Sequence, residues 1–167
     1  MYKRQDLGTG TGLLAFAAIE LWPSAEVTAT DIDPIAIDVT RENAALNGIG
    51  AGDDTGEVAL IVADGARDPA IEAGGPYDLV IANILAGPLI AMAPEVAAIA
   101  APDGTLVLAG LLSTQADDVE AAYRAAGCAP AERLVRGDWS ILRLRAGTEA
   151  TGNAPVGDRG GWASDGR

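Results

Sequence analysis

Short runs of apolar and β-branched residues alternate along the chain with longer stretches that repeat apolar positions every three or four residues. The short runs predict strands over residues 26–31, 58–63, 78–84 and 105–110. Two of them, 58–63 and 78–84, are apolar nearly throughout, which is typical of strands buried on both faces of a parallel sheet. The longer stretches predict helices over residues 13–21, 34–47, 88–100 and 114–126. This alternation predicts an α/β fold with a mainly parallel central sheet.

Proline, glycine and asparagine mark several of the predicted boundaries. Pro34 suits the first turn of its helix, and Asn47-Gly48 is a typical stop at the other end. Residues 134–136 and 140–145 flank Gly137-Asp138. These two segments are therefore predicted to form a closing antiparallel hairpin.

The start of the chain does not fit this pattern. A glycine turn begins at Gly8, so a strand should precede it, yet Lys3-Arg4-Gln5 is too polar for a central parallel strand. We interpret the first strand as truncated, with residues 1–5 a cut or non-native leader and residues 6–146 the domain. A genuine but frayed first strand is the alternative.

The end of the chain has a different composition. Residues 147–167 contain six glycines and no apolar periodicity. Such a segment cannot bury enough apolar surface to order itself. It is predicted to be a disordered tail, in which Trp162 is incidental.

Charge and missing residue types narrow the function. The net charge is −13, and residues 6–120 hold most of the acids with only Arg41 and Arg67 as cations, which argues against direct nucleic-acid binding. The absence of His excludes a His base or a His metal ligand, and Cys128 alone cannot form an internal disulfide or a thiolate zinc site, so no metal is expected. No apolar run suits a membrane span or a signal peptide. A soluble, monomeric, cytoplasmic protein is expected.

The strongest chemical signal is the segment Asp6-Leu7-Gly8-Thr9-Gly10-Thr11-Gly12. Its glycines let the chain turn sharply and let a ligand lie against the backbone, at the N-terminus of the helix that follows. A plain strand-to-helix turn is the alternative. Dinucleotide sites read G-x-G-x-x-G, but the third glycine position counted from Gly8 holds Leu13. Asp6 would repel a pyrophosphate and attract a cation, which favours the methionine end of S-adenosylmethionine over NAD.

Acidic residues follow the next two predicted strands. Asp31 ends the second strand, where an acid can accept hydrogen bonds from both ribose hydroxyls of a nucleotide. Asp33 precedes Pro34 and is interpreted as a helix cap. Asp64 ends the third strand and could contact an adenine amino group, although a solvated loop acid is an equal alternative.

Asn83 lies at the end of the fourth predicted strand and begins the segment Asn83-Ile84-Leu85-Ala86-Gly87-Pro88. Ligands of such sheets sit beyond the carboxyl ends of the strands. The Asn83 carbonyl oxygen could accept an N–H of an amine and aim the nitrogen lone pair at a methyl group. A turn or cap asparagine is the simpler alternative.

Taken together, these segments resemble a known family. DLGTGTG, TDIDP, RENAALNG and above all ANILAGPLIAMAP are similar to PrmA, the bacterial ribosomal protein methyltransferases, and the likeness runs from about Asp6 to Arg145. The resemblance implies a Rossmann-like class I methyltransferase fold and S-adenosylmethionine as cofactor. It also implies methylation of amines, lysine or α-amino, on the eleventh large-subunit ribosomal protein. Gly8, Asp31 and Asn83 fall on the family's cofactor positions. The family's substrate-gripping N-terminal domain and a Gly-Thr-Gly-Thr-His segment have no counterpart here, so only the catalytic domain is matched.

Other functions stay open at this point. Methyltransferases of glutamine amides or nucleic acids commonly carry N-P-P-aromatic where this chain has Asn83-Ile84-Leu85-Ala86. A catalytically inert cofactor-binding fragment is a further alternative, and an NAD enzyme is disfavoured by Leu13. The arginines at 133, 136, 143 and 145 could contact a partner, although a solvated face is the simpler interpretation. With no His present, water or a carboxylate would have to take the proton of the amine.

Overall fold

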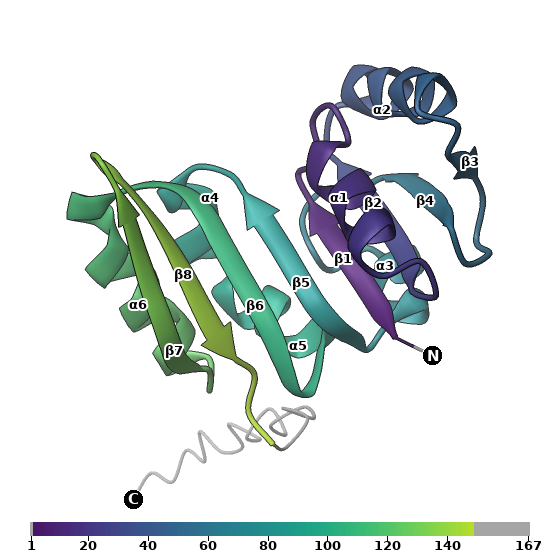
Figure 1. The fold of residues 1–167 in the computed structure, drawn as a ribbon. Helices are drawn as coiled ribbons and strands as arrows, with labels where there is room; N and C mark the ends of the chain where they lie inside the picture. The colour runs from purple at the N-terminus through teal and green to yellow at the C-terminus, as the bar shows by residue number, and fades with distance from the viewer. Residues whose placement is uncertain (1, 149–167) are drawn as a thin grey trace, which may run out of the picture.

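A computed structural model describes residues 2–148 and contains one eight-stranded sheet with helices on both faces (Figure 1). The strands are β1 (Lys3–Leu7), β2 (Glu26–Asp31), β3 (Gly50–Ala51), β4 (Glu57–Val62), β5 (Tyr77–Asn83), β6 (Ala100–Leu112), β7 (Ala129–Arg136) and β8 (Trp139–Arg145). Their order across the sheet is β3-β4-β2-β1-β5-β6-β8-β7. Only β8 runs against its neighbours. The predicted mainly parallel sheet with a C-terminal antiparallel hairpin is therefore confirmed.

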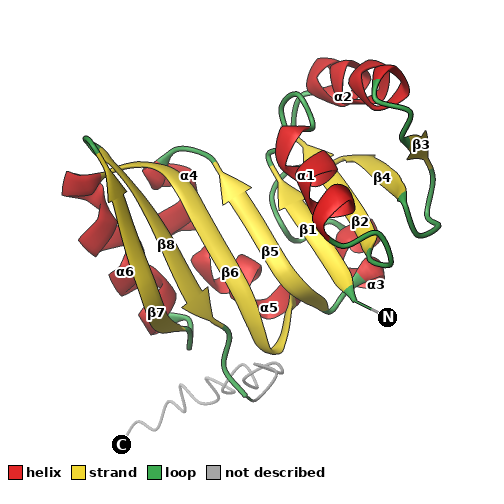
Figure 2. Ribbon diagram, viewed as in Figure 1, coloured by secondary structure: helices red, strands yellow, loops and turns green. Residues whose placement is uncertain are grey.

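Six helices connect the strands and cover the sheet unevenly (Figure 2). They are α1 (Leu13–Leu21), α2 (Pro34–Leu46), α3 (Pro69–Gly74), α4 (Ala86–Ala91), α5 (Ala93–Ile99) and α6 (Ala116–Ala125), the last preceded by a 3₁₀ turn at Ser113–Gln115. Helix α1 lies in front of β1 and β2, whereas α4, α5 and α6 lie behind β5, β6 and β8. Within residues 2–148, no helix is long and apolar enough to cross a membrane.

The chain reverses its direction of travel across the sheet next to β1. It first builds β2 and β4 on one side of β1, and it then returns to place β5 and β6 on the other side. Parallel strands bring their carboxyl ends to one edge, and ligands of open α/β sheets bind where the strand order reverses. The ends of β1, β2, β4 and β5 therefore define the expected position of a site.

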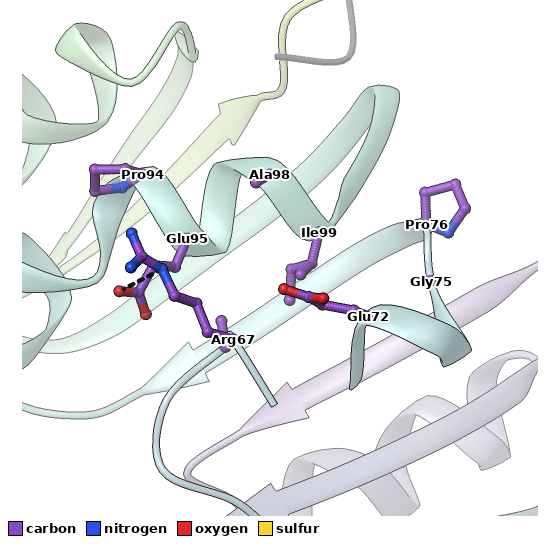
Figure 3. A pocket seen from close by; sticks show the side chains of 9 residues that line it. Arg67, Glu72, Gly75, Pro76, Pro94, Glu95, Ala98 and Ile99 are labelled. Atoms are coloured by element: carbon purple, nitrogen blue, oxygen red, sulfur yellow. Dashed lines mark ion pairs between the residues drawn. The ribbon is translucent and has the colours of Figure 1, made fainter. Parts of the chain in front are cut away.

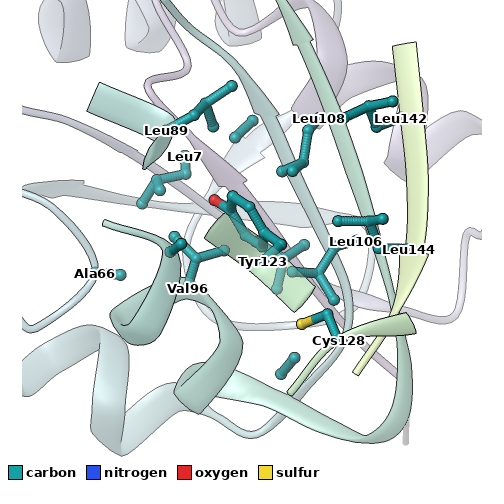
Figure 4. Packing of buried hydrophobic residues seen from close by; sticks show 14 of the residues in the cluster. Leu7, Ala66, Leu89, Val96, Leu106, Leu108, Tyr123, Cys128, Leu142 and Leu144 are labelled. Atoms are coloured by element: carbon teal, nitrogen blue, oxygen red, sulfur yellow. The ribbon is translucent and has the colours of Figure 1, made fainter. Parts of the chain in front are cut away.

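Two apolar cores hold the layers together. The smaller one joins Ala15, Ala18 and Ile19 of α1 to Val27 of β2 and Val58 of β4. The larger one lies on the opposite face, where leucines of β6 and β8 meet α4, α5 and α6 around Tyr123 and Cys128 (Figure 4). The smaller core takes its buried strand residues from β2 and β4, and the larger one takes them from β1, β5, β6 and β8.

The polar first strand is fully formed, so the argument that Lys3-Arg4-Gln5 is too polar for a central parallel strand is wrong, and so is the alternative of a frayed strand. Lys3–Leu7 pairs with β2 on one side and with β5 on the other. Arg4 is buried over the rings of Tyr2 and Trp22, with centroid distances of 5.4 and 4.9 Å. The Gln5 side chain is also buried, and its Nε2 donates to Thr30 Oγ1 at 2.9 Å.

Aromatic rings beside Arg4 and a hydroxyl partner for Gln5 thus let β1 lie at the centre of the sheet. The strand begins inside the segment that the sequence assigns to a leader, and the non-native origin of residues 1–5 stays a prediction. The predicted tail lies outside the described residues from position 149 onward, and so does Trp162.

The single helix expected over residues 88–100 is wrong. Two helices, α4 and α5, meet at Met92, and Pro94 occupies the first turn of α5. Proline has no N–H to continue the hydrogen bonds of the preceding helix. The short elements α3 and β3 were also missed, because α3 has only six residues and β3 only two.

The larger core contains a buried hydroxyl group, that of Tyr123, which lowers the stability of the folded state. Tyr123 is fully buried, yet its hydroxyl has no hydrogen-bond partner among the described residues. An unpartnered buried polar group costs about 1–3 kcal/mol. Tyr123→Phe should therefore raise the free energy of unfolding, by up to about that amount, in urea titrations followed by circular dichroism.

Tyr77 supplies the matched control, because its buried hydroxyl donates to the carbonyl oxygen of Ile71 at 3.1 Å. Tyr77→Phe should lower the free energy of unfolding by about 1 kcal/mol. Equal losses in the two variants would contradict the assignment of the Tyr123 hydroxyl as unpartnered.

Candidate functional site

A cavity of about 450 Å³ lies at the carboxyl edge of the sheet, where the strand order reverses. Its polar wall comes from Gly8 after β1, Asp31 at the end of β2, and Asp64-Gly65 after β4. Its apolar wall consists of Ile32, Ile84, Leu85, Pro88 and Met92. The predicted site segments at Gly8, Asp31 and Asp64 therefore meet at one cavity, although they are far apart in the sequence.

Gly8 is required by the shape of this cavity. Its φ of 71° lies in the left-handed region, and a Cβ atom there would collide with the side chain of Ile84. Its N–H donates to the carbonyl oxygen of Thr30 at 2.9 Å, which ties the start of the loop to β2. Glycine thus allows the loop after β1 to lie directly against the segment after β5.

The carboxylate of Asp6 lies beneath the loop, not in the wall of the cavity. Only 2% of the residue is exposed. Its Oδ2 accepts hydrogen bonds from Thr9 Oγ1 at 2.7 Å and from the N–H of Ala15 at 3.1 Å. Burial raises the pKa of Asp6, the two hydrogen bonds oppose that shift, and Asp31 raises the pKa further. The geometry therefore gives Asp6 a role in holding the loop onto the first turn of α1.

Asp31 connects the loop to the turn after β2. Its Oδ2 accepts from the N–H of Gly10 at 2.9 Å, and its Oδ1 accepts from the N–H of Asp33 at 3.0 Å. A carboxylate has about four acceptor positions, so both oxygens can still accept from a ligand. Asp33 itself caps α2 by accepting from the N–H of Ile35 at 2.9 Å, which confirms its interpretation as a cap.

Two residues of α2 also hold the loop, and sequence reasoning missed them. Thr40 Oγ1 donates to the carbonyl oxygen of Gly10 at 3.0 Å, and Asn43 Nδ2 donates to that of Thr11 at 2.9 Å. Gly12, the cap of α1, packs beside Thr40. The available signal was the spacing of three between Thr40 and Asn43, which places both side chains on one face of the helix.

Asn83 does not line this cavity but an adjoining one of about 650 Å³, which we call the second hollow. The two spaces share Ile84 and Leu85 as a common wall. Gly110 of β6 also lines the second hollow, and a Cβ atom on it would lie 3.0 Å from Asn83 Oδ1 and 2.6 Å from the carbonyl oxygen of Ile84. With a φ of 79°, Gly110 keeps the space beside the Asn83 amide open.

A third hollow, behind the sheet, contains none of the predicted site residues (Figure 3). Arg67 points toward Glu95 across its mouth, and Arg67 Nε lies 3.0 Å from Glu95 Oε1. Within residues 2–148, no group of three or more Asp, Glu, His or Cys side chains is placed to hold a metal ion.

Two of the four arginines near the end of the domain pair with acids. Arg133 Nη2 lies 2.7 Å from Asp117 and 3.1 Å from Glu120. Arg143 Nε lies 3.2 Å from Glu132 across the hairpin. Because these acids neutralise Arg133 and Arg143, the contacts favour a solvated face over a basic surface that docks a partner.

Comparison with known proteins adds an independent observation. A sequence model of the family described as ribosomal protein L11 methyltransferase (PrmA) matches residues 3–146. The ribosomal protein L11 methyltransferase of Agrobacterium fabrum is 47% identical over 140 residues, which cover 84% of this chain and 46% of that protein. The counterpart in Brucella suis is 41% identical and covers 84% and 47%. The chain thus spans about half the length of these curated relatives.

Solved structures show the same similarity in three dimensions. The ribosomal protein L11 methylase of Lactobacillus delbrueckii subsp. bulgaricus is 32% identical with a TM-score of 0.76, covering 87% of this chain and 70% of that one. A TehB-like SAM-dependent methyltransferase from Corynebacterium glutamicum is 17% identical with a TM-score of 0.64, covering 87% and 80%, and it shows the fold alone. The predicted Rossmann-like methyltransferase fold is therefore confirmed.

The buried carboxylate of Asp6 leads to a prediction about stability and pH. Because burial raises its pKa in the folded state, the folded protein gains stability when Asp6 is protonated and loses that gain as pH rises through the folded-state pKa. Asp6→Asn keeps an acceptor oxygen without the buried charge. The variant should be more stable than the parent protein at pH 7, and the difference should shrink as pH falls toward 4.

Urea unfolding between pH 4 and pH 7.5 measures this difference. Asp54→Asn, at an exposed loop position, is the control and should show no comparable gain. A loss of stability in Asp6→Asn at pH 7, or a gain that is independent of pH, would refute the assigned effect of burial.

Proposed function

The chain belongs to the ribosomal protein L11 methyltransferase family, PrmA, and we propose that it binds S-adenosylmethionine and methylates an amine of a large-subunit ribosomal protein. The amine is a lysine side chain or an α-amino group. One observation carries the proposal: Gly8, Asp31 and Asp64, from the ends of three strands, meet at one cavity whose opposite wall is apolar.

The cavity fits the cofactor in size and in chemistry. Small-molecule sites usually measure about 300–1,000 Å³, and this one is about 450 Å³. Ile32 and Leu85 are 64% and 71% exposed, and both line the cavity, so a flat adenine ring would cover apolar surface that now faces water. Asp64 lines the same cavity and would accept a hydrogen bond from the adenine amino group.

The remaining cofactor contacts follow from the polar wall. Asp31 would accept hydrogen bonds from the ribose hydroxyls, while Gly8, Gly10 and Gly12 shape the loop that faces the methionine part. The buried carboxylate of Asp6 holds this loop and adds negative potential beneath a cationic ligand. When bound, the cofactor supplies an electrophilic methyl group on a sulfonium.

Asn83 is the proposed catalytic residue, because it faces the second hollow beside the wall shared with the cofactor cavity. Its Oδ1 would accept an N–H of the amine and direct the nitrogen lone pair toward the shared wall. Most of the rate would come from this positioning, since direct displacement at a methyl group needs in-line alignment.

The proposed partner and setting follow from the same features. The names of the curated relatives point to a ribosomal protein as substrate. The net charge of −13 favours a basic protein partner over direct contact with nucleic acid. A single, buried Cys128 suits the reducing cytoplasm, where we place the protein as a monomer.

Calorimetric titration of the purified chain with S-adenosylmethionine and, separately, with NADH tests the cofactor. We expect saturable binding of S-adenosylmethionine and none of NADH. Binding of NADH alone would refute the methyltransferase assignment. Binding of neither would identify the chain as an inert fragment.

Asp31→Ala tests the ribose contact. Removal of a hydrogen-bonded carboxylate from a ligand site should weaken cofactor binding by about 1–3 kcal/mol, roughly 5- to 150-fold in Kd. Asp38→Ala, which removes an exposed acid of α2 paired with Arg41, is the control and should leave Kd unchanged. An unchanged Kd in Asp31→Ala would remove Asp31 from the site.

A further inference from the structure

The second hollow has an unusual lining for a site that should receive a charged side chain. Of the eleven residues that line it, none is Asp, Glu, Lys or Arg. Its polar members are Asn83, Ser140 and the indole of Trp139. The Ser140 hydroxyl already donates to Ser113 Oγ at 3.0 Å. The Asn83 amide is therefore the main polar group left for a ligand.

Trp139 forms the outer wall of this space. It begins β8 and pairs in register with Leu112 of β6, next to the Gly110 bend that opens the Asn83 amide. The residue is 55% exposed. No described helix covers this face of β6 and β8 in Figure 1. The indole can thus pack against a ligand that lies along the sheet.

We propose that the second hollow binds an aliphatic primary amine in its uncharged form, and that Trp139 is the residue that positions the alkyl stem beside Asn83. This inference rests on the proposed methyl transfer. The chain has no His to take the proton of the amine. The hollow instead selects the neutral amine by excluding its charged form. The amine gives its proton to bulk water before it binds.

The physical basis is desolvation. Moving an ammonium group into an apolar space without a carboxylate disfavours its charged form and lowers its pKa. Asn83 Oδ1 can accept an N–H from the neutral amine, which leaves the lone pair free. The alkyl stem gains by burying apolar area against Trp139, Ile141 and Val107.

The charged groups around the hollow do not supply a counter-ion to an ammonium there. On the sheet face, Arg143 lies opposite Val107 and is paired with Glu132. The buried carboxylate of Asp6 pairs in register with the lining residue Ile81, but it accepts hydrogen bonds from Thr9 and Ala15. The other charged residues on the lining strands, on helix α1, in and across the hairpin and in the cofactor cavity are Glu20, Asp31, Asp64, Asp78, Asp103, Arg133, Arg136, Asp138 and Arg145. None of these lines the second hollow.

The test uses n-butylamine as the probe and the indole N–H of Trp139 as the reporter. The ¹⁵N-labelled chain is titrated by NMR at pH 7, 8 and 9, with and without S-adenosylhomocysteine. Because the neutral fraction of an amine with a pKa near 10.4 rises about tenfold per pH unit, the apparent affinity should rise about 100-fold from pH 7 to pH 9. n-Butanol, which does not titrate, should bind with an affinity independent of pH.

Variants separate positioning from a general effect on the sheet. Trp139→Leu should weaken butylamine binding at least fivefold, observed at the Asn83 side-chain amide, and should leave cofactor affinity unchanged. Trp139→Phe, which keeps an aromatic wall, should restore most of the affinity. Leu134→Ala removes an exposed apolar side chain of the neighbouring strand, outside the hollow, and is the matched control.

Butylamine affinity that is constant or falls with rising pH would overturn the proposal, because a site with a carboxylate counter-ion behaves in that way. So would a lack of a saturable shift at Trp139. If the chain binds S-adenosylhomocysteine but fails these tests, the proposed function stands and this inference falls. If butylamine binds as expected and no cofactor binds, the hollow is supported and the proposed function falls.

Discussion

The burial of one carboxylate organises the whole site. Asp6 is buried in the central strand β1, and its Oδ2 is shared by Thr9 of the loop and the backbone of Ala15 in α1. An acceptor that is buried and charged must be satisfied, so the loop has to close over it and bring the first turn of α1 into place. The direction of the loop, the position of Gly10 against Asp31 and the opening of the cavity all follow from that closure.

Two glycines position the residue that lies between the cofactor cavity and the second hollow. Gly8 allows contact with Ile84, and Gly110 allows β6 to approach the carbonyl oxygen of that same residue. Ile84 is thereby held between two backbones and separates the cofactor cavity from the second hollow. The two spaces share Ile84 and Leu85, so ligands bound in them would be neighbours, as direct transfer requires when the reacting atoms must come within about 3–3.5 Å.

Sequence patterns predicted the strands β2, β4 and β5, the helix α1 and the hairpin because each carries a local signal of periodicity or turn chemistry. They failed for β1, since Arg4 and Gln5 are stabilised by Trp22 and Thr30, which are distant in the sequence. They also failed at Met92, where one proline outweighs an otherwise continuous helical pattern. Local signals cannot show which distant side chain will satisfy a buried polar group.

The candidate site likewise contains residues that the sequence predicted and residues that it could not predict. The residues after each strand, Gly8, Asp31 and Asp64, were predictable because parallel strands bring their carboxyl ends to one edge. The supporting residues Thr40 and Asn43 were not, because polar side chains on one face of a helix also occur wherever that face meets water. Trp139 was missed for a similar reason, since an isolated exposed aromatic residue has no periodicity, and only its neighbours in space give it a role.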